Sequence, residues 1–189
     1  MSTNAARQTL QQRVATAILE GAAQTLAAQG PAASMNDVAA ASGVARATVY
    51  RYFPSRRALL NELAFIALRE ADDRIVSARI DEVPTQEAIS RVVGVLVDIG
   101  DAFIVLARER ARPQEFERKL AGPVARLFER GQASGDIRDD LPVAWLTESL
   151  FGLTLSVLTS MPSQGREDTV AAITSLFLDG ARRREPRLL

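Results

Sequence analysis

The chain has 189 residues, with 23 basic and 23 acidic ones, so its formal net charge is zero. It contains no cysteine and no histidine, which excludes disulfides and removes the usual zinc ligands and the usual general base. Aromatic residues make up only 5% of the chain, and no 18-residue stretch is both apolar and uncharged. We therefore expect a soluble, cytoplasmic, all-α protein that uses no metal, cofactor or membrane.

The charges are distributed unevenly along the chain. Residues 1–57 contain six arginines and two acidic residues, a balance of +4, and the remainder contains 17 basic and 21 acidic residues, a balance of −4. A basic end on an acidic body concentrates the attraction for phosphate groups at that end. The run Arg182-Arg183-Arg184 is interpreted instead as a solvated helix end, where basic side chains suit the helix dipole.

The first predicted element is a helix over residues 7–29. Its apolar residues recur with helical spacing, and Gly30-Pro31 ends it; the residues concerned are Leu10, Val14, Ile18 and Leu26.

Residues 34–60 read SMNDVAAASGVARATVYRYFPSRRALL and contain two short helices, 35–41 and 46–52. Ser34 with Asp37 three residues later is typical of a capping box at a helix start. Gly43 can take the positive φ that a sharp turn between helices often needs. Val49 and Phe53, four residues apart, face inward. This pattern indicates a helix-turn-helix whose second helix fits the major groove of DNA, although a plain αα-hairpin with a solvated basic face has the same pattern.

The segment GVARATVYRYFPSRRALL also resembles the TetR-type transcriptional regulators, whose signature reads roughly GVSxGTLYxHFxSKExLL. The resemblance is specific over residues 14–63 and general beyond them. The sequence departs from the signature in several places: Ala45 replaces the usual Ser, Tyr52 the usual His, and Arg56-Arg57 the common Lys-Glu pair. Ala47 stands where Gly is frequent and Pro31 where an aromatic residue is frequent.

The outward face of the second helix supplies the predicted DNA contacts. We expect Arg46 to reach a base edge, because arginine pairs well with guanine. Phosphate contacts are expected from Thr48, Tyr50, Tyr52 and Arg56, and the predicted DNA-binding set is completed by Ser34, Ala47 and Arg51.

Prolines, glycines and polar turns divide the rest of the chain. The predicted helices, which bring the total to nine, cover residues 56–80, 85–109, 114–120, 124–134, 143–160 and 167–184. The helix at 56–80 has no Gly or Pro, so we expect it to be the mechanical link between the DNA-binding end and the body.

Helix 85–109 is apolar on nearly all sides, which indicates burial. Asp98 and Asp101 share one face of it. Either they line an effector cavity, where they would receive a cationic or hydrogen-bonding ligand, or they lie on a solvent-facing stripe or form salt bridges with nearby arginines. The predicted pocket also includes aromatic residues, for which plain core packing is the alternative: Phe103, Phe116, Phe128, Trp145 and Phe151.

The last two helices have apolar stripes too wide for simple surface helices. The resemblance implies that these helices form a dimer interface, and the alternative is a core within one chain. The residues of the predicted interface are Leu146, Leu150, Leu153, Val157, Val170, Ile173 and Phe177.

Together these features and the resemblance predict a nine-helix all-α protein. A three-helix DNA-binding domain would occupy residues 1–54, and an effector-binding and dimerisation domain residues 55–189. The predicted function is a homodimeric transcriptional repressor that binds a palindromic double-stranded operator and is released by a small hydrophobic effector. One alternative is a helical adaptor that contacts another protein through its helix-turn-helix. Another is an enzyme, for which the Asp98–Asp101 pair is the only conceivable acid–base group.

Overall fold

The computed structural model describes residues 2–110, 112–160 and 165–183, whose regular structure is helical apart from one isolated bridge between Ile137 and Arg182. The all-α fold class is therefore confirmed. The elements are α1 (Ser2–Gln29), the 3₁₀ turn η1 (Gly30–Ala32), α2 (Met35–Ser42), α3 (Arg46–Tyr52), α4 (Arg56–Ser77), α5 (Thr85–Asp98), α6 (Gly100–Glu109), α7 (Pro113–Phe116), the π-helical turn η2 (Glu117–Ala121), α8 (Gly122–Ser134), α9 (Val143–Ser160) and α10 (Arg166–Ala181).

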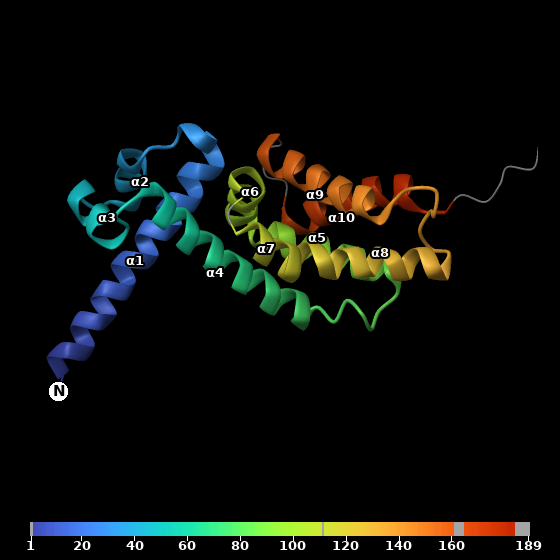
Figure 1. The fold of residues 1–189 in the computed structure, drawn as a ribbon, viewed down its shortest axis with the longest axis horizontal. Coiled ribbons are helices and arrows are strands. Elements are labelled where there is room, and N and C mark those ends of the chain that lie inside the picture. Colours follow the sequence, from blue (N-terminus) through green and yellow to red (C-terminus); the bar gives the residue numbers. More distant parts are fainter. Residues whose placement is uncertain (1, 111, 161–164, 184–189) are drawn as a thin grey trace, which may run out of the picture.

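The molecule is elongated, with a small head at one end and a helical body at the other (Figure 1). The head consists of α1, α2 and α3, and α4 runs from it along the body. Helices α5 and α8–α10 pack against one another in the body, and α6 lies between them and the head (Figure 1).

Two of the predicted helix divisions differ from the structure. The segment predicted as one helix over 85–109 is two helices, because the chain turns at Ile99 and Gly100 takes φ +33°. The segments predicted as separate helices at 114–120 and 124–134 form one continuous run. Pro123 has no N–H to donate, and the turn before it widens, so that Gly122 N–H bonds to the carbonyl of Glu117 five residues back. With this run counted once, the described residues form nine helices, as predicted.

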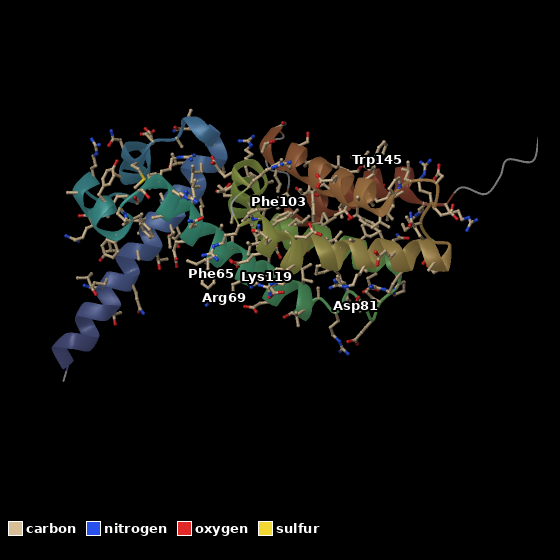
Figure 2. The ribbon with its side chains drawn as sticks, viewed as in Figure 1. Phe65, Arg69, Asp81, Phe103, Lys119 and Trp145 are labelled. Carbon is tan, nitrogen blue, oxygen red and sulfur yellow. The ribbon has the colours of Figure 1, made fainter. Side chains whose placement is uncertain are left out.

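The apolar core is divided between the head and the body, and α6 contributes to both parts. Val105 is 1% exposed in the head core, whereas Phe103 is fully buried in the body core (Figure 2). Between them, Leu106 joins a small cluster with α4 residues. The head core also contains Leu59 and Leu63 of α4, so it is built from residues on both sides of the predicted domain boundary at 54/55.

Candidate nucleic-acid interface and ligand cavity

The start of α2 has the capping box that the sequence predicted. Ser34 Oγ accepts a hydrogen bond from the N–H of Asp37 at 3.3 Å, and the Asp37 carboxylate accepts one from the N–H of Ser34 at 2.9 Å. The Ser34 hydroxyl also donates a hydrogen bond to the Asp37 carboxylate at 2.6 Å. This bond, followed by the one from the Ser34 N–H, lowers the pKa of the Asp37 carboxyl. Ser34 is exposed, but its hydroxyl is engaged in this cap.

Two glycines determine how α2 and α3 are held. Gly43 ends α2 with φ +67°, and its N–H bonds to carbonyls of the last turn. Gly21 lies where α1 crosses α2, and a Cβ placed there would lie 2.8 Å from the backbone nitrogen of Ser42. Val49 and Phe53 are 0% and 7% exposed in the head core, which confirms their predicted inward orientation. These contacts fix the orientation of α3.

The outer face of α3 is basic and open to solvent. Arg46, Ala47, Tyr50 and Arg51 are exposed, whereas Thr48 and Tyr52 are half-buried. The guanidinium of Arg46 lies over the Tyr50 ring at 5.4 Å, and that of Arg51 lies over the Tyr52 ring at 5.5 Å. Within the described part of the chain neither arginine pairs with a carboxylate. The sequence-predicted residues of α3 therefore form one surface that bears two unpaired positive charges.

Arg56, predicted to contact phosphate, has a protein partner in the structure. Its guanidinium forms two hydrogen bonds with the Glu109 carboxylate at 2.7 and 3.2 Å, and the Glu109 side chain is only 11% exposed. The pair joins the first residue of α4 to the last residue of α6, two helix ends where each charge is unfavourably placed relative to the helix dipole. A phosphate would therefore have to compete with Glu109 for Arg56, whereas the neighbouring Arg57 is exposed.

Asp98 and Asp101 do not form a shared face, because the break at Ile99 puts them on different helices. Asp98 accepts hydrogen bonds from Arg166 at 2.8 Å and from Arg74 at 3.2 Å. It therefore forms salt bridges with arginines, which was the alternative to a role in an effector cavity. The bonds from Arg166 are the main reason why the pKa of the Asp98 carboxyl is lowered. It borders an open hollow of about 530 Å³ together with Arg74, Arg91 and Arg166. Asp101 is exposed on the first turn of α6.

The five predicted pocket aromatics have different surroundings. Phe103 and Phe128 are fully buried core residues, as the core alternative describes. Trp145 is 66% exposed at the outer edge of α9 (Figure 2), and it does not border the cavity that Phe116 and Phe151 line. Only Phe116 and Phe151 border a cavity, where their rings meet edge to face with centroids 5.6 Å apart.

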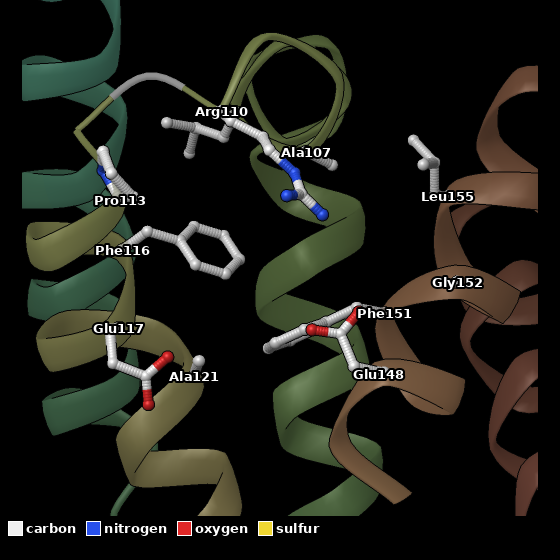
Figure 3. Close-up of a pocket in the computed structure, with 11 residues that line it drawn as sticks. Ala107, Arg110, Pro113, Phe116, Glu117, Ala121, Glu148, Phe151, Gly152 and Leu155 are labelled. Atoms are coloured by element: carbon white, nitrogen blue, oxygen red, sulfur yellow. The ribbon is translucent and has the colours of Figure 1, made fainter. Parts of the chain in front are cut away.

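This cavity has a volume of about 370 Å³ and lies between α6, the α7–η2 segment and α9 (Figure 3). Its polar groups are Arg110, Glu117 and Glu148, which approach it from three different segments (Figure 3). None of the three forms an ion pair with a described residue. The lining therefore carries one positive and two negative charges beside two aromatic rings. The full lining is Leu106, Ala107, Arg110, Pro113, Phe116, Glu117, Ala121, Glu148, Phe151, Gly152 and Leu155.

Helix α6 connects this cavity to the head. Leu106 and Ala107 line the cavity, and the preceding residue, Val105, is buried in the head core. Arg108 donates a hydrogen bond to the carbonyl of Ala27 in α1 at 3.0 Å, and Glu109 pairs with Arg56 of α4. Consecutive residues of α6 thus contact the cavity, α1 and α4. The sequence predicted that α4 alone connects the DNA-binding end to the body, whereas in the structure α6 connects them as well.

The predicted interface residues of α9 and α10 belong mostly to the core of the chain. Leu146, Leu150, Ile173 and Phe177 are at most 6% exposed in the body core, which corrects their assignment to a dimer interface in favour of a core within one chain. The partly buried residues Leu153, Val157 and Val170 pack against that core.

Other apolar residues on these two helices are open to solvent. Trp145 and Leu176 are 66% and 62% exposed. Among the described residues, α9 is the one helix long and apolar enough to cross a membrane by those two criteria alone, and only 28% of it is buried. The pair of helices therefore presents apolar side chains to solvent. They include Trp145 and Leu176 outside the predicted set and the partly buried Leu153, Val157 and Val170 within it, and we call these residues the uncovered apolar face.

Comparisons with known proteins agree with this architecture. A sequence profile described as bacterial regulatory proteins, tetR family, matches residues 18–63. The HTH-type transcriptional repressor LfrR of Mycolicibacterium smegmatis is 37% identical over 98 residues, which is 52% of this chain and 51% of LfrR, so the match spans about half the length of that relative.

Solved structures extend the similarity in fold to almost the whole chain. The crystal structure of the TetR-like transcriptional regulator LfrR from Mycobacterium smegmatis in complex with proflavine is 27% identical, with a TM-score of 0.70, and the match covers 89% of this chain and 96% of that one. A bacterial regulatory protein in the tetR family from Rhodococcus RHA1 is 18% identical, also with a TM-score of 0.70, over 91% of this chain and 98% of that one.

Proposed function

We propose that the chain is a cytoplasmic transcriptional repressor of the TetR family that is released from its operator by a small molecule. The tetR-family profile over residues 18–63 and the similarity to LfrR support this proposal. TetR-family proteins are transcriptional regulators and not enzymes, so no catalytic role is assigned to the cavity. The observation that carries the proposal is the outer face of α3, which has two arginines without carboxylate partners among the described residues and is held rigidly from behind by Val49 and Phe53.

In this proposal α3 enters the major groove and Arg46, at its first turn, contacts a guanine. A good bidentate contact of this kind is worth ~1–3 kcal/mol of discrimination between bases. Thr48, Tyr50 and Tyr52 contact phosphates and set the register, which adds affinity without sequence preference. Arg51 adds a second positive charge on the same surface.

Selection of bound sequences from a random DNA pool, followed by affinity measurements on the selected site, tests this role. Arg46→Ala is expected to relax the preference at one position in each half-site. Arg69→Ala is the matched control, because Arg69 is an exposed arginine of α4 remote from α3 (Figure 2). If Arg46→Ala weakens selected and random DNA by the same factor, Arg46 does not read a base. If the wild-type protein retards no DNA at any salt concentration, an adaptor role replaces the repressor.

The second part of the proposal is a two-fold dimer through the uncovered apolar face of α9 and α10. Two heads related by a two-fold axis would read a palindromic operator with half-sites roughly 34–36 Å apart. The exposure of Trp145 and Leu176 supports this arrangement. Leu176→Glu is expected to give a folded monomer in sedimentation experiments. Phe177→Arg is the contrasting variant: Phe177 packs on Phe128 in the core, so its replacement is expected to unfold the chain. A Leu176→Glu protein that remains dimeric rules out this face.

The third part assigns the effector to the cavity of about 370 Å³. Its two aromatic rings and its excess of one carboxylate suit a flat aromatic cation, since such a ligand gains both ring stacking and charge attraction. Proflavine, the ligand in the LfrR complex, is a compound of this class.

Paired titrations separate charge from shape in this proposed site. Glu117→Gln with Glu148→Gln is expected to weaken binding of proflavine and to leave binding of the uncharged parent ring, acridine, unchanged. Asp98→Asn with Asp101→Asn is the control, because these residues lie outside the cavity. Equal losses for both compounds would show that the carboxylates do not select charge.

Release from DNA would follow from a shift of α6. A ligand against Leu106 and Ala107 would displace the same helix that holds α1 through Arg108 and α4 through Glu109. Typical couplings between sites are ~1–3 kcal/mol and are reciprocal. Calorimetry with and without operator DNA should therefore find that DNA weakens ligand binding as much as the ligand weakens DNA binding. Ligand affinity that is independent of DNA contradicts this switch.

A further inference from the structure

The N-terminal part of α1 projects beyond the head. Helix α1 begins at Ser2. Among its side chains from Thr9 onward, which are the ones described, the first packed against the head core is Val14 and the first fully buried one is Ile18. Residues 9–13 are all exposed, and Leu10 is 61% exposed. Residues 2–13 would span about 18 Å at 1.5 Å per residue. Figure 1 shows this segment extending outward at the same end of the long axis as α3.

A projecting helix of this length has little stability of its own. Isolated helices shorter than about 12–15 residues are marginally stable in water, since most helix stability comes from packing of one face. The segment has little apolar surface with which to pack against a protein, because Leu10 is the only large apolar residue in 9–13. A partner that stabilises it is therefore expected to be polar or charged.

The charge of this segment specifies the partner. Residues 1–19 contain Arg7 and Arg13 and no acidic residue. Arg13 is exposed and pairs with none of the described carboxylates, and Gln11 and Gln12 beside it add amide donors. Glu20 borders the same shallow hollow as Arg13 but forms no ion pair with it. Guanidinium and amide donors on a segment that itself contains no acid match the phosphate backbone of DNA, which is the polyanion expected at this end of the molecule.

We infer that residues 2–13, here called the arm, lie along the DNA backbone outside the segment read by α3, with Arg7 and Arg13 at phosphates. This inference rests on the proposed DNA-binding function and extends it. The arm adds affinity without sequence preference, and it enlarges the operator beyond the base pairs that α3 contacts.

The test uses the full-length protein and two operator duplexes, one limited to the selected core and one with about one helical turn, ~10 base pairs, added on each side. Arg7→Gln with Arg13→Gln removes both charges and keeps residues of similar helix propensity. On the long duplex, loss of two phosphate contacts per arm should make the slope of log affinity against log salt concentration less steep by about 1.8. The ratio of wild-type to variant affinity should therefore fall roughly tenfold per arm between 50 and 200 mM salt. On the core duplex the two proteins should bind equally.

Arg69→Gln with Arg118→Gln is the matched control. It removes two exposed arginines from the body and so changes the net charge equally. If the arm variant behaves like this control on the long duplex, or loses the same affinity on both duplexes, the arm does not contact flanking DNA. A change in its sedimentation would assign the arm to a protein contact and overturn the inference. Failure of the wild-type protein to bind either duplex would refute the DNA-binding function itself and thus differs from these outcomes.

Discussion

Replacing Gly21 by alanine tests whether the close crossing of α1 and α2 holds the reading helix in place. The added Cβ would lie 2.8 Å from the backbone nitrogen of Ser42 and 3.1 Å from its Cα. Ordinary contact begins at 3.4 Å, so the two helices must separate by about 0.6 Å. The atoms met are the backbone nitrogen, Cα and Cβ of Ser42 at the end of α2, and rotation of the Ser42 side chain moves none of them. The displacement is therefore passed on to Gly43 and α3.

The expected cost follows from two opposing effects. Overpacking of this kind costs about 1–3 kcal/mol, and replacing a helical glycine by alanine returns roughly 0.5–1 kcal/mol. The net loss of stability is thus between about 0 and about 2.5 kcal/mol, while the tilt of α3 is expected to reduce operator affinity measurably. Chemical denaturation and DNA titration of the same protein separate these two effects.

Gly180→Ala is the control, because a Cβ at Gly180 meets nothing within 4 Å and the residue is exposed in α10. This variant should be as stable as the wild-type protein or slightly more stable. If Gly21→Ala is equally stable and binds the operator with wild-type affinity, the crossing at Gly21 does not control the orientation of α3.

Three further predictions concern the body and its link to the head. Glu109→Gln is expected to tighten DNA binding, because Arg56 loses its carboxylate partner and becomes available to a phosphate; titration of this variant with and without Arg56→Gln checks it, and a gain that persists without Arg56 would contradict it. Because the folded pKa of Asp98 is lowered, its contribution to stability should be present above the ordinary carboxyl pKa of about 3.9 and disappear as pH falls through the folded value. Urea melts of wild type and Asp98→Asn at pH 7, 5 and 3 measure this contribution, and a stability difference that persists at low pH would argue against it. In Gly131→Ala the new Cβ would lie 2.6 Å from Ile137 Cγ1 and 2.9 Å from Thr85 Cγ2, so a loss of ~1–3 kcal/mol is expected in thermal melts, and a raised melting temperature would show that these side chains adapt.

The sequence predicted the head well because its signals are local. Ser34 and Asp37 cap one another three residues apart, and Val49 and Phe53 are separated by a single helical turn. The partner of Asp98 could not be predicted in this way, since Arg166 lies 68 residues further along the chain.

The cavity was the least predictable part, because Arg110, Glu117 and Glu148 come from three separate segments. One signal for it was present: Glu148 is the only charged residue in 143–160. In contrast, Trp145 was wrongly predicted to line the cavity. An aromatic residue at the edge of a helix's apolar stripe can point toward the core or toward solvent, and Trp145 points toward solvent.

The head core contains residues of α4 and α6, which limits how this protein can be re-engineered. A graft of residues 1–54 onto another body would carry Val49 and Phe53 without Leu59, Leu63 and Val105, which complete their packing. A chimera would therefore need matching residues from the host's equivalents of α4 and α6. Changes to exposed positions such as Arg46 and Tyr50 have no such requirement, because those side chains do not take part in the core. New operator preferences are therefore more accessible through substitutions on the outer face of α3 than through exchange of whole heads.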